Sequence, residues 1–212
     1  ELAKSQNLNY IQLATGDSPR AMMGYSITQL LYILNHYSLI SDGFKNELNK
    51  TASLIDELQE EIQADAEKMT NHLFGKIPII YACDGYKGMA VRFTQQLAEN
   101  SKMLSWHNII PEMNHNELVG WRTKNENLAV IFFRNETDHK RNQKRIEINS
   151  EVVSKYTSSV MEYWSKGDSM IEKTFYLINV CDHVSFNLSK RNNVIVEEIE
   201  VINYLKGELA KF

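Results

Sequence analysis

The chain has few cysteines, and the two that it has are far apart. They are Cys83 and Cys181 in a chain of 212 residues. Neither belongs to a CxxC pair or to a Cys/His spacing that would hold zinc, which argues against a structural zinc site. Both lie in apolar stretches, so we expect buried and inert thiols.

An excess of positive charge is also missing. The 23 Lys and Arg residues stand against 27 Asp and Glu residues, and the formal net charge is −4. A field of that sign does not attract a phosphate backbone, so no nucleic-acid partner is expected. One or two local cations would still be enough to bind a small anionic substrate.

Signals for export or membrane insertion are absent as well. There is no signal peptide and no apolar run of transmembrane length, which predicts a cytoplasmic protein without a membrane partner. The chain begins with Glu1 rather than methionine, which suggests that its natural start lies upstream.

No internal repeat, low-complexity tract or long flexible linker interrupts the chain, and its last two thirds alternate between strand and helix patterns. Short apolar runs predict strands at 77–83, 103–109, 128–134 and 159–167. Helical patterns at 89–102, 135–157 and 168–192 lie between or after them, and a short helix is expected at 201–212. This alternation predicts an α/β fold with a doubly wound parallel sheet.

The first third is predicted to be mostly helical. Residues 8–13 (LNYIQL) predict one short strand, and Ser18 and Pro19 are expected as the N-cap and first residue of the helix that follows. That helix, over 20–39, is apolar nearly all round, which predicts heavy burial. A long amphipathic helix is expected over 44–74. Because one short strand is not stable without neighbours, this part is expected to be the back end of a domain.

Polar segments after the predicted strands are candidates for a site, because ligands of open parallel sheets bind beyond the carboxyl ends of the strands. The loop 84–88 (DGYKG) is a weak phosphate signal and is more simply a turn. His115 has polar neighbours on both sides, unlike most core histidines. A functional histidine and a solvated loop fit His115 equally well.

Three further residues are candidates. Glu99 lies near the end of a helix with an apolar opposite face, and alone it fits a solvated glutamate. Arg20 is expected in the first turn of an apolar helix, where the helix dipole disfavours a cation, and such departures from local rules concentrate at functional sites. Lys206, taken alone, fits a solvated helix face.

Together these residues resemble a known family, the bacterial and archaeal bifunctional phosphoglucose/phosphomannose isomerases. The specific signal is AENSK (98–102) followed by PEMNHNE (111–117), which places Glu99 and His115 sixteen residues apart. GDSPRA (16–21) and INYLK (202–206) match the same family in the same order, although each is weak alone.

The resemblance implies two sugar isomerase (SIS) domains, each a five-stranded parallel α/β unit of the flavodoxin-type three-layer kind. It assigns residues 1–40 to the C-terminal remnant of a first SIS domain, 41–75 to a connecting helix and 76–212 to the second SIS domain. In the family, Ser/Thr-rich loops of the first domain hold the sugar phosphate on helix N-termini. No such loop precedes Gly16, so we expect this chain to be an inactive fragment.

The resemblance also implies a reaction, the aldose–ketose isomerisation of glucose 6-phosphate and fructose 6-phosphate through a cis-enediol. Glu99 would be the base, and Arg20 would stabilise the enediolate. His115 and Lys206 would move protons during ring opening. His115 would come from a neighbouring subunit, which implies a homodimer. No metal and no organic cofactor is called for.

One position departs from the family. Ile199 stands where members tend to have a threonine associated with the mannose epimer, so mannose 6-phosphate is the less secure substrate.

Two other readings of the function remain: a non-catalytic SIS module that binds a sugar phosphate as a regulatory signal, and a structural fragment without binding. The regulatory reading gives no reason for the four candidate residues to occur together. For catalysis, we expect Glu99 and the His115 loop at the same, carboxyl-end edge of the sheet.

Overall fold

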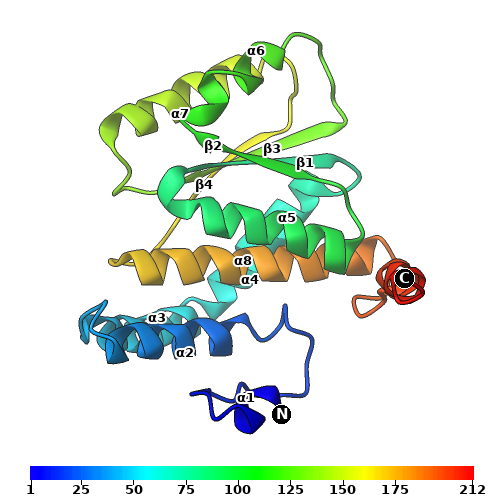
Figure 1. The fold of residues 1–212 in the computed structure, drawn as a ribbon. Coiled ribbons are helices and arrows are strands. Elements are labelled where there is room, and N and C mark those ends of the chain that lie inside the picture. The colour runs from blue at the N-terminus through cyan, green and yellow to red at the C-terminus, as the bar shows by residue number, and fades with distance from the viewer. The chain divides into compact units, whose positions relative to one another are not determined.

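The computed structural model describes all 212 residues and is shown in Figure 1. The chain divides into two compact units, Glu1–Glu47 and Leu48–Phe212. The predicted boundaries after residues 40 and 75 remain predictions.

The helices and strands follow one another in the order expected for an α/β chain. The first unit contains α1 (Leu2–Ser5), α2 (Met23–His36) and the start of α3 (Gly43–Glu57). In the second unit, after the end of α3, come α4 (Gln59–Leu73), β1 (Ile77–Cys83), η1 (Asp84–Tyr86), α5 (Lys87–Ser101), β2 (Trp106–Ile110), η2 (Glu112–Asn114), α6 (Glu117–Gly120), β3 (Leu128–Arg134), α7 (Lys140–Val153), β4 (Val160–Trp164), α8 (Met170–Arg191) and α9 (Glu200–Leu209).

The four strands form one parallel sheet in the order β2-β1-β3-β4. From β1 the chain moves outward to β2 and then returns across β1 to β3 and β4, so the predicted doubly wound parallel sheet is confirmed. In the register, Ile79 of β1 faces Trp106 of β2 and Val130 of β3. The family resemblance implied five strands in this domain, and the structure has four.

Helices cover both faces of this sheet, which gives three layers (Figure 1). On one face, Tyr81 and Phe132 stack with ring centroids 5.1 Å apart and pack with Ile146 and Val153 of α7. On the other face, Phe93 of α5 lies edge-on to Phe133, with centroids 6.2 Å apart. The alternation of side chains along each strand explains this division, because successive residues point to opposite faces.

The amphipathic pattern at 44–74 forms two helices rather than one. Leu58 has φ −98° and ψ 11° and serves as the N-cap of α4, although its N–H still donates to Leu54 O over 3.0 Å and its carbonyl still accepts from Ile62 N–H over 2.8 Å. Ile62 and Ala66 of α4 are nevertheless buried, as their spacing predicts.

Three expectations for the first unit are wrong. Residues 8–13 form no strand, because no other strand lies in this unit to pair with them. Ser18 and Pro19 lie in a turn, in which Ala21 N–H donates to Ser18 O over 2.9 Å, and α2 begins only at Met23. No residue of α2 is buried, because a unit that ends at Glu47 supplies too few neighbouring elements to cover it.

Both thiols are buried, as the sequence predicts. Burial raises the pKa of Cys83 to about 12 and also raises the pKa of Cys181, so both remain protonated and unreactive near neutral pH. No His, Cys, Asp or Glu residues are grouped so that they could hold a metal ion. None of the helices has both the length and the apolar character needed to cross a membrane.

Candidate functional site

Glu99 lies at the amino-end edge of the sheet. It is carried by α5, which starts beyond the carboxyl end of β1 and runs back to the start of β2 at Trp106. Glu99 is two residues from the end of this helix and is half-buried. The expectation that Glu99 lies at the carboxyl-end edge is therefore wrong, because a helix that connects two parallel strands must return to the opposite edge.

The residues that follow Glu99 attach the end of α5 to α8. Asn100 Nδ2 donates to Ser185 Oγ over 3.0 Å, and Ser101 Oγ donates to Ser185 O over 2.7 Å. Asn192 Nδ2 donates in turn to Ser101 O over 2.9 Å. Asn100 and Ser101 are buried, so the polar residues of the AENSK run have structural partners and fix the backbone that carries Glu99.

Lys102 ends α5 in the left-handed conformation, with φ 56° and ψ 37°. Its ammonium donates to three backbone carbonyls, those of Glu99 at 2.6 Å, Glu198 at 2.8 Å and Val196 at 3.3 Å. Lys102 therefore connects the last turn of α5 to the segment that precedes α9.

His115 is carried by the loop after β2. It directly follows η2, and its side chain is exposed. Before it, Met113 is fully buried and Asn114 Nδ2 donates to Asn149 Oδ1 over 2.6 Å. After it, Asn116 Nδ2 donates to Glu112 Oε1 over 2.8 Å. An exposed histidine is thus presented on a loop whose flanking residues are fixed.

Glu117 anchors the same loop, and the sequence analysis did not single it out. Its Oε1 accepts from Tyr81 OH at 2.5 Å and from Trp106 Nε1 at 2.9 Å, while Oε2 accepts from Asn108 Nδ2 at 2.6 Å. Burial, and then the neighbouring Glu117 carboxylate, raise the pKa of Tyr81, which stays a hydrogen-bond donor. The only signal in the sequence was the place of Glu117 in the PEMNHNE run, because its three partners come together only in the fold.

The sheet separates Glu99 from His115 within one chain. Met113 and Trp121, on either side of His115, belong to the core cluster on the α7 face, whereas α5 covers the opposite face (Figure 1). Glu99 also precedes β2 and His115 follows it, and a strand of five residues spans about 16 Å. The two side chains of one chain are therefore too far apart to act on the same reacting carbons.

Lys206 and Arg20 lie in different units. Lys206 is exposed on α9, which follows the segment held by Lys102. Arg20 belongs to the first unit and lies half-buried in the turn before α2, not in the first turn of that helix as expected. Ile199, the position that departs from the family, immediately precedes α9.

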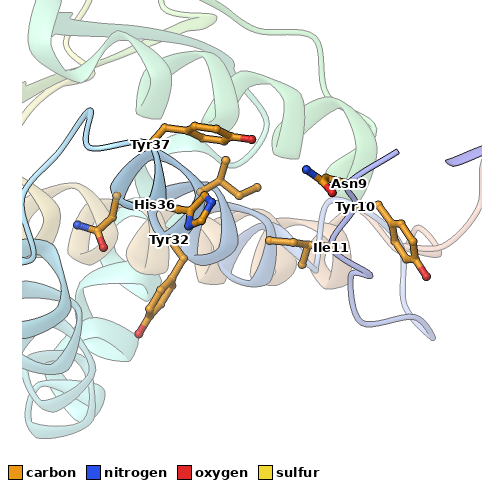
Figure 2. Close-up of a pocket in the computed structure, with 8 residues that line it drawn as sticks. Asn9, Tyr10, Ile11, Tyr32, His36 and Tyr37 are labelled. Atoms are coloured by element: carbon orange, nitrogen blue, oxygen red, sulfur yellow. The ribbon is translucent and has the colours of Figure 1, made fainter. Parts of the chain in front are cut away.

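Three hollows of the surface bear on the four candidates, and one of them, of about 450 Å³ in the first unit, is lined by Ala21, the neighbour of Arg20. Another hollow in the first unit, of about 690 Å³, is lined by aromatic and amide side chains, among them Tyr10, Tyr32, His36 and Tyr37 (Figure 2). The third, of about 420 Å³, adjoins Glu117 and Trp106. None of the three is lined by a predicted catalytic residue.

The DGYKG loop (84–88) forms η1 and leads directly into α5, as a turn would.

A parallel sheet covered by helices on both faces is a fold that the chain shares with solved structures of other proteins. The C-terminal domain of glucosamine-fructose-6-phosphate aminotransferase from Francisella tularensis has this fold, with a TM-score of 0.64, 11% sequence identity and coverage of 89% of this chain and 58% of that one. Residues 62–209 match the family of bacterial phospho-glucose isomerase C-terminal SIS domains, and the chain belongs to this family.

Curated relatives agree with that assignment. The chain is 30% identical over its whole length to a bifunctional phosphoglucose/phosphomannose isomerase of Caldicellulosiruptor bescii, and 26% identical to one of Aquifex aeolicus. It spans 65% and 64% of the length of these two relatives. The family predicted from the two motifs is thereby confirmed.

Proposed function

We propose that this chain forms part of an aldose–ketose isomerase that interconverts glucose 6-phosphate and fructose 6-phosphate through a cis-enediol. The observation that carries the proposal is the match of the whole chain to bifunctional phosphoglucose/phosphomannose isomerases. Mannose 6-phosphate is a second proposed substrate, and Ile199 is the position at which this chain differs from the family pattern.

Glu99 is the proposed base that moves the proton between C1 and C2. Its support is chemical and structural: a carboxylate suits this transfer, and Glu99 is half-buried on a helix end fixed by Asn100 and Ser101. A fixed base is held at one distance from the reacting carbons, which is what proximity catalysis needs.

His115 is proposed to act in the site of a second copy of the chain. Because the sheet lies between Glu99 and His115, one chain does not bring the two together, whereas a homodimer with two-fold symmetry could join Glu99 of one copy to His115 of the other. The exposure of His115 and the anchoring of its loop fit a side chain offered to a neighbouring molecule.

Lys206 and Arg20 have further proposed roles in the reaction. Lys206 would share with His115 the proton transfers of ring opening. Arg20 would stabilise the negative oxygens of the enediolate, because a guanidinium keeps its charge at all working pH values.

The direct test is a coupled assay of the full-length protein that carries this chain. Fructose 6-phosphate is supplied and glucose 6-phosphate is detected through its dehydrogenase, with and without the protein. Steady turnover supports the proposal. Absence of turnover with both fructose 6-phosphate and mannose 6-phosphate, in a folded protein, would rule it out.

A further inference from the structure

Lys102 occupies a backbone position that an ordinary lysine does not favour. Met103 N–H donates to Leu97 O over 3.1 Å, so the backbone turns back onto the last turn of α5 directly after the left-handed Lys102. Glycine is preferred there, and short polar residues are tolerated. The other non-glycine residues with positive φ are short and polar: Asn7, Ser38 and Asn193. The long side chain of Lys102 therefore has to be explained by its contacts.

Those contacts join two segments of the proposed site. One of the three carbonyls that receive the Lys102 ammonium belongs to Glu99 itself. The other two belong to Val196 and Glu198, which stand just before α9 and its Lys206. Since α9 has no buried residue, little apolar packing within this chain fixes it, and the bonds from Lys102 hold the segment that leads into it.

We propose that Lys102 is a positioning residue that holds the start of α9, and so Lys206, at the end of α5 that carries Glu99. This inference rests on the proposed function for its catalytic meaning. Its structural part, the attachment of α9 through the 196–198 segment, stands by itself and can be measured without any substrate.

The first experiment is amide hydrogen exchange on the full-length protein, followed at residues 200–209. Lys102→Met removes the three N–H donors, and we expect exchange there to become at least about tenfold faster, because bonds from a charged donor to carbonyls are lost. Lys102→Arg keeps a cationic donor and should restore most of the protection. Lys87→Met, at the other end of α5 and also exposed, is the matched control and should leave the exchange unchanged.

Lys102→Gly separates positioning from simple helix capping. Glycine relieves the left-handed backbone, so the melting temperature should stay the same or rise. The exchange of residues 200–209 should still become faster, as in Lys102→Met. If Lys102 were only a cap, Lys102→Gly would leave α9 as protected as in the parent, and that result would overturn the proposal.

The second experiment measures fructose 6-phosphate turnover by the same variants. We expect kcat to fall roughly tenfold in Lys102→Met and Lys102→Gly with little change in KM, since a displaced proton donor affects the chemical step more than phosphate binding. If exchange at residues 200–209 became faster while kcat stayed unchanged, Lys102 would have no role in catalysis. A parent protein without turnover would instead refute the proposed function, and the exchange data would still decide whether the attachment exists.

Discussion

Glu99 is the residue on which the proposed chemistry depends most. Glu99→Gln keeps the size and the hydrogen-bonding reach of the side chain but removes the base. We expect kcat for fructose 6-phosphate to fall by roughly 10²–10⁴-fold, the usual contribution of a positioned general base. KM should change little, because the phosphate is held elsewhere in the proposed site. Steady-state kinetics of the full-length protein measure both.

Glu112→Gln is the control for that substitution. The glutamine keeps an oxygen that can accept from Asn116, as Glu112 does at 2.8 Å. We expect a much smaller effect on kcat. If Glu112→Gln abolishes turnover while Glu99→Gln leaves it intact, the base has been placed on the wrong carboxylate.

His72 predicts a pH dependence of stability. Burial lowers its pKa from the usual 6.5, with a further lowering by Lys76, and its Nε2 lies 3.1 Å from Val130 O. The unfolded chain therefore binds the proton more readily than the folded one. The stability that comes from keeping His72 neutral is fully present above the pKa that His72 has in the unfolded chain. It is lost as the pH falls through the lower pKa that His72 has in the folded protein. Urea unfolding between about pH 7.5 and pH 5.5 should show a falling free energy of unfolding. His72→Gln should reduce that slope, and an unchanged slope would contradict the assignment.

At the scale of elements, the loop 111–121 depends on Glu117. Glu117→Ala leaves Trp106 Nε1 and Asn108 Nδ2 without their acceptor and removes one partner of Tyr81 OH. We expect a loss of about 1–3 kcal/mol in the free energy of unfolding, because the hydroxyl of the buried Tyr81 loses its acceptor. Glu117→Gln, which keeps an acceptor oxygen, should cost less.

Glu151→Ala is the comparison for Glu117→Ala. Glu151 is exposed on α7 and its ion pair with Lys155 is 3.8 Å long, so its removal should change stability by no more than about 0.5 kcal/mol. Denaturant unfolding of the three variants gives the ranking. Equal stabilities for Glu117→Ala and Glu151→Ala would show that the Glu117 contacts are not energetically important.

The strands could be predicted from the sequence because their signal is local. IPIIYAC (77–83) and LAVIFFR (128–134) are apolar runs of strand length, and both form strands with the expected bounds. The interruption at Leu58 could not be predicted, because its neighbours keep the helical spacing on both sides. The heavy burial expected for α2 was wrong for a different reason: an apolar pattern shows that a helix can be covered, but not that a covering element is present.

The candidate site was only partly predictable. The motifs identified the residue types and the family, and the strand–helix order already contained the position of Glu99, since a crossover helix ends at the amino edge. The Glu117 contacts could not be foreseen, because Tyr81 is 36 residues away and Trp106 and Asn108 face Glu117 only once the loop after β2 has folded back. Nor does any local pattern show that the loop of His115 packs on the face opposite α5.

At the scale of the whole molecule, we expect residues 1–212 alone to show little or no isomerase activity. The chain spans 65% and 64% of its relatives in Caldicellulosiruptor bescii and Aquifex aeolicus. The family resemblance places the phosphate-binding loops in a first domain, of which it assigns only residues 1–40 to this chain. Binding energy from a remote phosphate helps to align reacting carbons, so its loss lowers turnover as well as affinity. Ordinary turnover of fructose 6-phosphate by purified residues 1–212 would contradict this expectation.

The shared site predicts that two defective variants restore one another. In full-length protein, Glu99→Gln lacks the base and His115→Ala lacks the residue proposed for ring opening, so each should turn over closed-ring sugar slowly. Equal amounts that exchange subunits freely form mixed dimers in about half of all cases, and each mixed dimer has one site with both native residues. The mixture should therefore regain about a quarter of the parent activity.

Subunit exchange has to be shown independently, with a tag on one variant and its recovery in pulled-down mixed dimers. The control is each variant mixed with itself, which should stay at its own low activity. If mixed dimers form and no activity returns, Glu99 and His115 do not meet across a two-fold axis. In that case the separation of the two residues by the sheet would mean that at least one of them has no place in the chemistry.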